Sequence, residues 1–216
     1  MKRFMARFLE LLLGLFLFAL GIVLTINANI GYAPWDVFHA GLALTIGLSI
    51  GVASIIVGIV ILVIVTACGE KIGLGTILNV ILIGGFIDLI MFSGIIPVLE
   101  NFVGGVVMLI AGLFIISVGS CFYIKSAFGA GPRDSLMVLV TKKTKLPVGV
   151  CRGAIELIVT LAGWFLGGMV GAGTVISVIA IGFCIQIIFK AFKFNIATVK
   201  HESLKQTFDF LAKTKT

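Results

Sequence analysis

The sequence Gly31-Tyr-Ala-Pro-Trp-Asp36 returns 98 positions later as Gly129-Ala-Gly-Pro-Arg-Asp134. Both copies keep a glycine, a proline and an aspartate at the same spacing, and each follows an apolar run long enough to cross a bilayer. Glycine permits backbone conformations with positive φ, and proline fits the first turn of a helix. The pair therefore predicts two interruptions of the apolar sequence, each followed by the start of a short helix.

The composition indicates a membrane protein. Of the 216 residues, 60% are hydrophobic and 12% are charged, and a soluble domain carries about twice that charged fraction. The formal net charge of +7 could suggest a nucleic-acid partner, but the basic residues gather at the two ends and in one central segment. That distribution is the one produced by membrane orientation. We therefore expect contact with the lipid bilayer and no binding of nucleic acid.

Six apolar runs are predicted to cross the membrane, because about 20 helical residues span the hydrocarbon. A short helix is predicted after each motif, over 34–47 and from 132 to about 145, and neither is long enough to cross. The basic segment 1–7 precedes a run without a cleavage site, so we expect the first span to be retained. Residues 1–190 then form one membrane domain, and residues 191–216 form a cytoplasmic tail. The predicted spans are 8–26, 50–68, 76–92, 103–124, 149–166 and 175–189.

The lysines and arginines predict which side of the membrane each loop faces. With the N-terminus inside, all 16 fall in cytoplasmic segments, and the outer segments (about 27–49, 93–102 and 167–174) contain none. Cytoplasmic loops of membrane proteins carry this excess of positive charge. We therefore expect both termini in the cytoplasm, and short helices that enter the membrane without crossing it.

The offset of 98 positions relates residues 14–91 to residues 112–189 without a gap, and eight glycines recur at equivalent positions. Each repeat (about 8–92 and about 103–189) contains three spans, an odd number, so the two copies cross the membrane in opposite directions. The predicted fold is an all-α membrane protein with six transmembrane helices, arranged as two inverted three-helix repeats with one short re-entrant helix each. Many transporters have this architecture and bind substrate between the repeats.

The two motifs form the predicted substrate-binding site. Backbone N–H groups at the start of each short helix can hold a polar or anionic group. The aspartates could instead cap the helices and offset their dipoles, or bind a cation or a proton. One difference between the copies breaks their symmetry in charge: the tryptophan of the first is an arginine in the second, which could bind an anion or pair with an aspartate. The candidate residues are Gly31, Pro34, Trp35, Asp36, Gly129, Gly131, Pro132, Arg133 and Asp134.

Two acids within the predicted spans, Glu156 and Asp88, are candidates for coupling transport to an ion. Ionisable side chains are costly in the bilayer and often functional there. Either acid could equally be a satisfied structural group. Arg152 precedes Glu156 by four residues, which is the spacing of a helical ion pair.

Other polar residues and the cysteines receive structural interpretations. Asn79 and its repeat equivalent Ser177 are expected to form hydrogen bonds between helices. His39 is interpreted as a histidine at the membrane interface, and His201 as a residue of the tail. The four cysteines are scattered among apolar residues without metal-ligand spacing. No Ser-His-Asp set and no phosphate-binding lysine motif is found, so the sequence predicts no catalytic residue, metal, cofactor or enzymatic activity.

The segments Gly31-Tyr-Ala-Pro-Trp-Asp-Val-Phe38 and Gly129-Ala-Gly-Pro-Arg-Asp-Ser-Leu136, in a six-span chain of this length, resemble the YczE/YitT group of bacterial integral membrane proteins. The paired motifs are most similar to the YczE-like branch. The similarity runs from the first span through the sixth and leaves out the tail. It implies a location in the bacterial plasma (inner) membrane, and no established binding or catalytic residue follows from it.

We therefore expect a transporter or channel for a small polar or anionic solute. Without an ATPase motif, the chain would act as a secondary carrier or channel. One rival is a substrate-capture subunit of an ATP-driven uptake complex, which would bind a separate ATPase partner. The other is a non-transporting membrane factor that assists secretion, biosynthesis or signalling, and it would tolerate Asp36→Asn and Asp134→Asn but not changes to the tail. A homo-oligomer is compatible with each of these functions.

Overall fold

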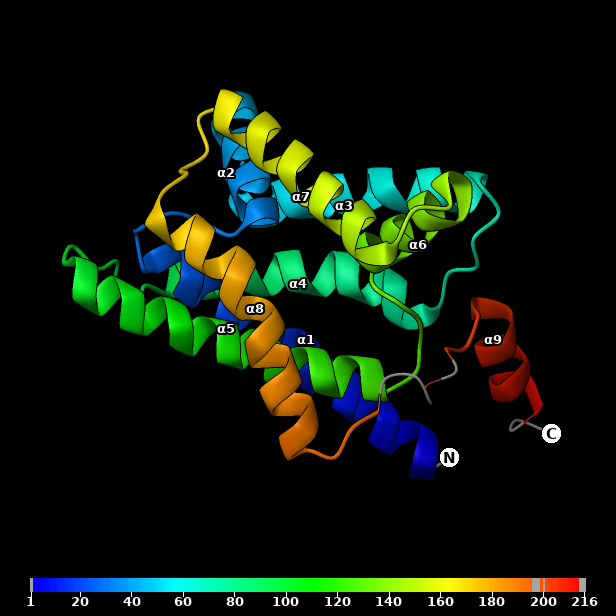
Figure 1. Ribbon diagram of the computed structural model, residues 1–216. Coiled ribbons are helices and arrows are strands. Elements are labelled where there is room, and N and C mark those ends of the chain that lie inside the picture. Colours follow the sequence, from blue (N-terminus) through cyan, green and yellow to red (C-terminus); the bar gives the residue numbers. More distant parts are fainter. Residues whose placement is uncertain (1, 196–198, 200, 214–216) are drawn as a thin grey trace.

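A computed structural model describes residues 2–195, 199 and 201–213, and the regular elements of these residues are all α-helices (Figure 1). Six are long and apolar enough to cross a membrane, which supports a multi-pass membrane protein. These six are α1 (Lys2–Asn27), α3 (Ile50–Ala67), α4 (Leu74–Ser93), α5 (Phe102–Lys125), α7 (Val148–Phe165) and α8 (Ala172–Ala191). The shorter helices are α2 (Pro34–Ile46), α6 (Pro132–Thr144) and α9 (Leu204–Lys213).

The first helix begins earlier than the sequence predicts, at Lys2 instead of about residue 8. Contacts with distant segments hold this polar first part. Arg7 donates hydrogen bonds to the carbonyl oxygen of Ser126 and to the carboxylate of Glu202, over 2.9 and 2.7 Å. The ring of Phe4 packs edge-on against the ring of Phe128. The polar first turns of α1 are therefore part of the packed structure.

The two short helices begin where the motifs predict. Pro34 and Pro132 occupy the first turns of α2 and α6, and each follows a residue with extended backbone. The helices end beside Gly47 and Lys145, which both adopt left-handed conformations with φ of 67° and 59°. Proline supplies no helical N–H, so it is well placed at these starts.

The contacts between helices define two sets, which the packing of α3 along α4 joins. In the first set, α1 packs along α5, α4 contacts α1, and α8 contacts α5. In the second set, α2 contacts both α3 and α7, and α6 contacts the same two helices. The second set lies in the upper part of Figure 1. The first part of α1 and the tail helix α9 lie at the same end of the molecule (Figure 1).

Residues related by the offset of 98 make reciprocal contacts. The backbone N–H of Gly75 donates to the carbonyl of Phe128 over 2.8 Å, and the N–H of Gly173 donates to the carbonyl of Ile30 over 2.7 Å. Close approaches of α1 and α5 follow the same rule, with glycines of one helix against backbone of the other. The approaching pairs are Gly14 with Gly119, and Gly21 with Gly112.

One pair of helices departs from this correspondence. α3 packs along α4, whereas the equivalent helices α7 and α8, which the structure describes throughout, make little or no contact. Asp88 of α4 strengthens the first contact, since its carboxylate accepts hydrogen bonds from the hydroxyl of Ser49 and the N–H of Gly51, over 2.5 and 2.9 Å. The second half of the chain is therefore more open than the first.

Candidate functional site

A cavity of about 440 Å³ lies between the two sets of helices, and each of the helices α1 to α8 contributes to its wall. The chain enters α2 and α6 at this cavity, so both helix starts face the same space. The first turns of α2 and α6 each contain an aspartate, Asp36 and Asp134. A carboxylate there is favoured by the positive end of the helix dipole.

Seven of the nine predicted binding residues line this cavity. Gly31 and Gly129 do not line it. Their φ angles are +113° and +130°, and their Cα atoms face the backbone of Gly171 and Gly73 respectively. A Cβ on Gly31 would lie 2.6 Å from the backbone nitrogen of Gly171, so these glycines are required for close packing. The seven lining residues are Pro34, Trp35, Asp36, Gly131, Pro132, Arg133 and Asp134.

Trp35 and Arg133, which occupy equivalent positions of the two motifs, join the motifs in space. The guanidinium carbon of Arg133 lies 5.0 Å from the centre of the Trp35 ring, within the range of a cation–π interaction. A nitrogen of the same guanidinium lies 3.9 Å from Oδ1 of Asp36. Nδ1 of His39 lies 3.7 Å from the same oxygen. The second motif thus places a cation against the tryptophan and the aspartate of the first.

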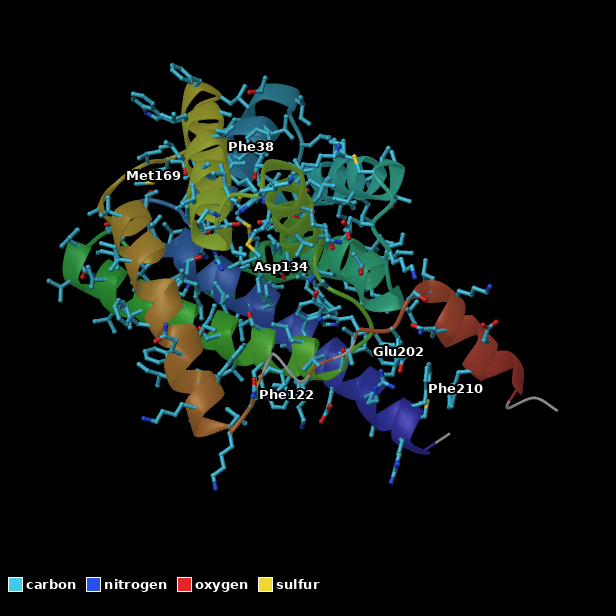
Figure 2. All side chains as sticks on the ribbon, turned by 45° about the vertical axis from the view of Figure 1, so that its right-hand side comes forward. Phe38, Phe122, Asp134, Met169, Glu202 and Phe210 are labelled. Carbon is cyan, nitrogen blue, oxygen red and sulfur yellow. The ribbon has the colours of Figure 1, made fainter. Side chains whose placement is uncertain are left out.

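Asp134 lies near the middle of the molecule (Figure 2) and faces the cavity. A side chain on Gly131 would enter a small polar niche. Its Cβ would lie 3.2 Å from the hydroxyl of Tyr123, 3.4 Å from Oδ2 of Asp134 and 3.8 Å from the amide nitrogen of Asn79. Burial by the surrounding protein raises the pKa of Asp134, and the positive charge of Arg152 opposes that rise. The niche joins α4, α5 and α6 at one point.

Of the two coupling candidates, Glu156 lines the cavity and Asp88 does not. Glu156 accepts a hydrogen bond from Nε of Arg152 over 2.9 Å, as their spacing predicts. Asp88 is held in the contact between α3 and α4. The sequence could not distinguish these cases, because the partners of Asp88 are more than 35 positions earlier in the chain.

The charged residues of the wall include three acids and two arginines. Asp36 is near Arg133, and Glu156 is paired with Arg152. Asp134 forms no ion pair within the described part of the chain. Burial lowers the pKa of both His39 and His201, which favours neutral imidazole. Counted by residue type, the wall therefore holds one more acid than arginine.

Four buried polar atoms of the wall form no hydrogen bond with any described residue. They are Oδ1 of Asp36, Nδ1 of His39, the hydroxyl of Tyr123 and the hydroxyl of Ser177. These side chains are almost completely buried, with exposed fractions of 1–3%. A buried polar group without a partner costs about 1–3 kcal/mol. Their convergence on one cavity indicates a site for a molecule that forms hydrogen bonds.

The sequence alone suggests other roles for some of these residues. It predicts an interfacial His39, whereas the structure buries this side chain, which is 2% exposed. Its position three residues after Asp36 places both on one helix face, which could have indicated the cavity. His201 of the tail also lines the wall, beside Glu202 at the end of the molecule that holds α9 (Figure 2). Tyr123 gave no sequence signal, since only the tertiary fold brings it to Asp134.

Most of the rest of the cavity wall is apolar, with Ser54 and Ser120 as polar exceptions. α1, α4, α5 and α8 contribute branched aliphatic side chains to it. The cavity wall therefore combines these apolar side chains with the polar groups described above. The aliphatic residues include Ile22, Val80, Ile83, Leu113, Ile116 and Ile181.

The six apolar helices define a multi-pass membrane protein, and comparison with known proteins identifies its family. The chain belongs to a family of unknown function (DUF6198), whose model matches residues 5–190. It is 39% identical over 177 residues to the uncharacterized membrane protein YczE of Bacillus subtilis (strain 168), an alignment that covers 80% of each chain. An uncharacterized protein of Haemophilus influenzae is 31% identical over 176 residues, covering 82% of this chain and 80% of the relative. No solved structure matches.

These findings confirm the resemblance to YczE-like membrane proteins. The family match ends at residue 190, so the tail lies outside it. The relatives' names identify no substrate, and the function must be inferred from the cavity itself.

Proposed function

We propose that this protein is a non-enzymatic secondary carrier or channel of the bacterial inner membrane, with the cavity as its substrate site. One observation supports this above all: both motif helices start at one cavity, where four buried polar atoms form no hydrogen bond with any described residue. Helices that begin inside a membrane protein are tolerated where they line such a space. Of the two solute classes expected, a polar solute fits better than a simple anion, because both arginines lie near acids.

The inverted arrangement of the two repeats belongs to the same proposal. It is supported by the reciprocal backbone hydrogen bonds of Gly75 and Gly173 and by the glycine contacts between α1 and α5. In this arrangement α2 and α6 are re-entrant helices that enter from opposite sides. The distribution of lysine and arginine supports cytoplasmic termini, and the shared end of α1 and α9 is compatible with that orientation (Figure 1).

The test is whether the cavity is reached from both sides of the membrane. A single cysteine, Ser177→Cys, is introduced into a chain whose four native cysteines have been replaced. A membrane-impermeant thiol reagent is then applied to right-side-out and to inverted vesicles. A carrier or channel predicts labelling from both sides. Labelling from one side only would contradict transport and favour the non-transporting membrane factor.

A further inference from the structure

The polar niche at Gly131 carries an inference about the substrate, which rests on the proposed function. Among the three acids of the wall, Asp134 alone has no ion pair within the described residues. Its Oδ2 and the hydroxyl of Tyr123 lie 3.4 and 3.2 Å from the position of a Cβ on Gly131. The carboxylate oxygen accepts hydrogen bonds, and the tyrosine hydroxyl, which can accept as well as donate, is one of the buried atoms without a hydrogen-bond partner among those residues. A donor with positive charge would satisfy both groups.

The size of the cavity and the chemistry of its wall favour an organic cation over a metal ion. Among the described residues, no group of three or more His, Cys, Asp or Glu side chains is arranged to hold a metal ion. A volume of about 440 Å³ lies within the range of small-molecule sites. The aliphatic wall of α1, α4, α5 and α8 suits an apolar body better than a hydrated ion. An organic molecule with a cationic end would therefore fit this cavity.

We propose that the substrate is an amine, with an ammonium group bound by Asp134 and Tyr123 and an apolar portion against the aliphatic wall. The ammonium charge offsets the unpaired carboxylate, and its N–H groups provide the missing hydrogen-bond donors. Because Gly131 has no side chain, the ammonium group can reach the carboxylate.

Three probes with the same ring test this proposal: benzylamine, benzyl alcohol and benzoate. Each is added at about 10 mM to the purified full-length protein in detergent, enough to occupy most of a site with a Kd of about 1 mM. We expect benzylamine to raise the thermal unfolding midpoint by about 2–4 °C. Benzyl alcohol and benzoate are expected to leave it nearly unchanged. A larger shift with benzoate, or no shift with benzylamine, would overturn the assignment.

Three variants test whether the shift caused by benzylamine arises from binding beside Asp134. Asp134→Asn removes the charge, and Gly131→Ala puts a methyl group into the niche while keeping the carboxylate. Both are expected to abolish the benzylamine shift. Glu70→Gln is the matched control, because Glu70 pairs with Lys142 on the surface and is not part of the cavity wall. An undiminished shift in Asp134→Asn would contradict the proposal. If benzylamine binds but the Ser177→Cys reporter is labelled from one side only, the amine site is supported and the proposed transport function is contradicted.

A second inference follows from the unequal contacts of the two halves. Gly51 faces the backbone of Gly84, and a Cβ on Gly84 would lie 2.5 Å from the carbonyl oxygen of Gly51. Their equivalents in the second half are Gly149 and Gly182, which face open space. Both α7 and α8 contribute residues to the cavity wall, although they make little or no contact. The wall is therefore held together by packing between α3 and α4, whereas α7 and α8 line the cavity without packing against each other.

We infer that these two glycine pairs are the alternating gates of the cavity. In the structure, Gly51 and Gly84 close the gate between α3 and α4, where the first turn of α3 packs against the middle of α4. In the opposite state Gly149 would meet Gly182, and the first pair would separate. Glycines at all four positions allow the backbones to approach in either state. By the predicted topology, the open gate faces the cytoplasm.

The labelling reporter Ser177→Cys tests this inference when it is combined with single substitutions at the gates. Gly149→Leu fills the open space and prevents closure, so labelling from the outer side is expected to fall at least about tenfold, while inner labelling persists. Gly153→Leu is the matched control: this glycine also faces open space, but its equivalent in the first half, Ile55, already carries a large side chain. Unchanged outer labelling in Gly149→Leu would overturn the gate. One-sided labelling of the parent chain would overturn transport as well.

Discussion

α3 and α4 pack against each other in the first half of the chain, and α7 and α8 stand apart in the second, although the two halves share their glycines. The difference lies in the polar residues near those glycines. Asp88 binds Ser49 and the backbone of α3, whereas the equivalent positions hold Gln186 and Pro147. Proline has no hydroxyl, so Pro147 could not reproduce the hydrogen bond that Ser49 donates. The glycines thus permit close packing of either helix pair, and the carboxylate of Asp88 stabilises the packing of α3 against α4.

The largest effect is expected from filling the closed contact. Gly51→Val places a branched side chain against the carbonyl of Gly84 and should lower the free energy of unfolding by about 3 kcal/mol. Gly149→Val faces open space and should change it by less than about 0.5 kcal/mol. Thermal unfolding midpoints in detergent measure both. Equal losses in the two variants would show that the halves do not differ as described.

The hydrogen bonds of Asp88 come next. Asp88→Ala removes an acceptor for the Ser49 hydroxyl and the Gly51 N–H, and should destabilise the protein by about 2 kcal/mol. Gln186→Ala, at the equivalent exposed position of α8, should change stability by less than about 0.5 kcal/mol. The same unfolding measurement applies. If Asp88→Ala leaves the stability unchanged, helix packing alone holds α3 against α4.

Much of the fold could be predicted from the sequence because its signals are local. Apolar runs of membrane length indicated the six long helices, and Pro34 and Pro132 indicated the starts of the short ones. The pair Arg152 and Glu156 follows from helical spacing alone. These features depend on neighbours within a few residues, which a single sequence records.

The cavity wall was predicted less completely, because it depends on residues far apart in the chain. The motifs identified Asp36, Arg133 and Asp134, but a motif glycine can face either a ligand or another backbone. Gly31 proved to face backbone. The hydroxyl of Tyr123 and the separation of α7 from α8 arise only when both halves are assembled.

The contact between the motifs offers a smaller test of how the halves join. A double-mutant cycle with Trp35→Ala and Arg133→Ala measures the coupling of the ring and the guanidinium, expected to be about 1 kcal/mol. The charge also lies near Asp36, so Arg133→Lys should retain only part of the coupling, because lysine lacks the flat guanidinium group. Additive single substitutions would indicate that the two motifs are near each other without interacting.

The smallest effect is expected at the C-terminal ends of α2 and α6, where the two halves of the chain carry different residues. Gly47 and Lys145 occupy equivalent left-handed positions, with φ of 67° and 59°. A lysine is disfavoured in this conformation and a glycine is not. Lys145→Gly should therefore raise stability by about 0.5 kcal/mol, and Gly47→Ala should lower it by a similar amount. The unfolding midpoints of the two variants should move in opposite directions. If Lys145→Gly lowers the midpoint instead, the lysine side chain contributes more to the second half than its backbone conformation costs.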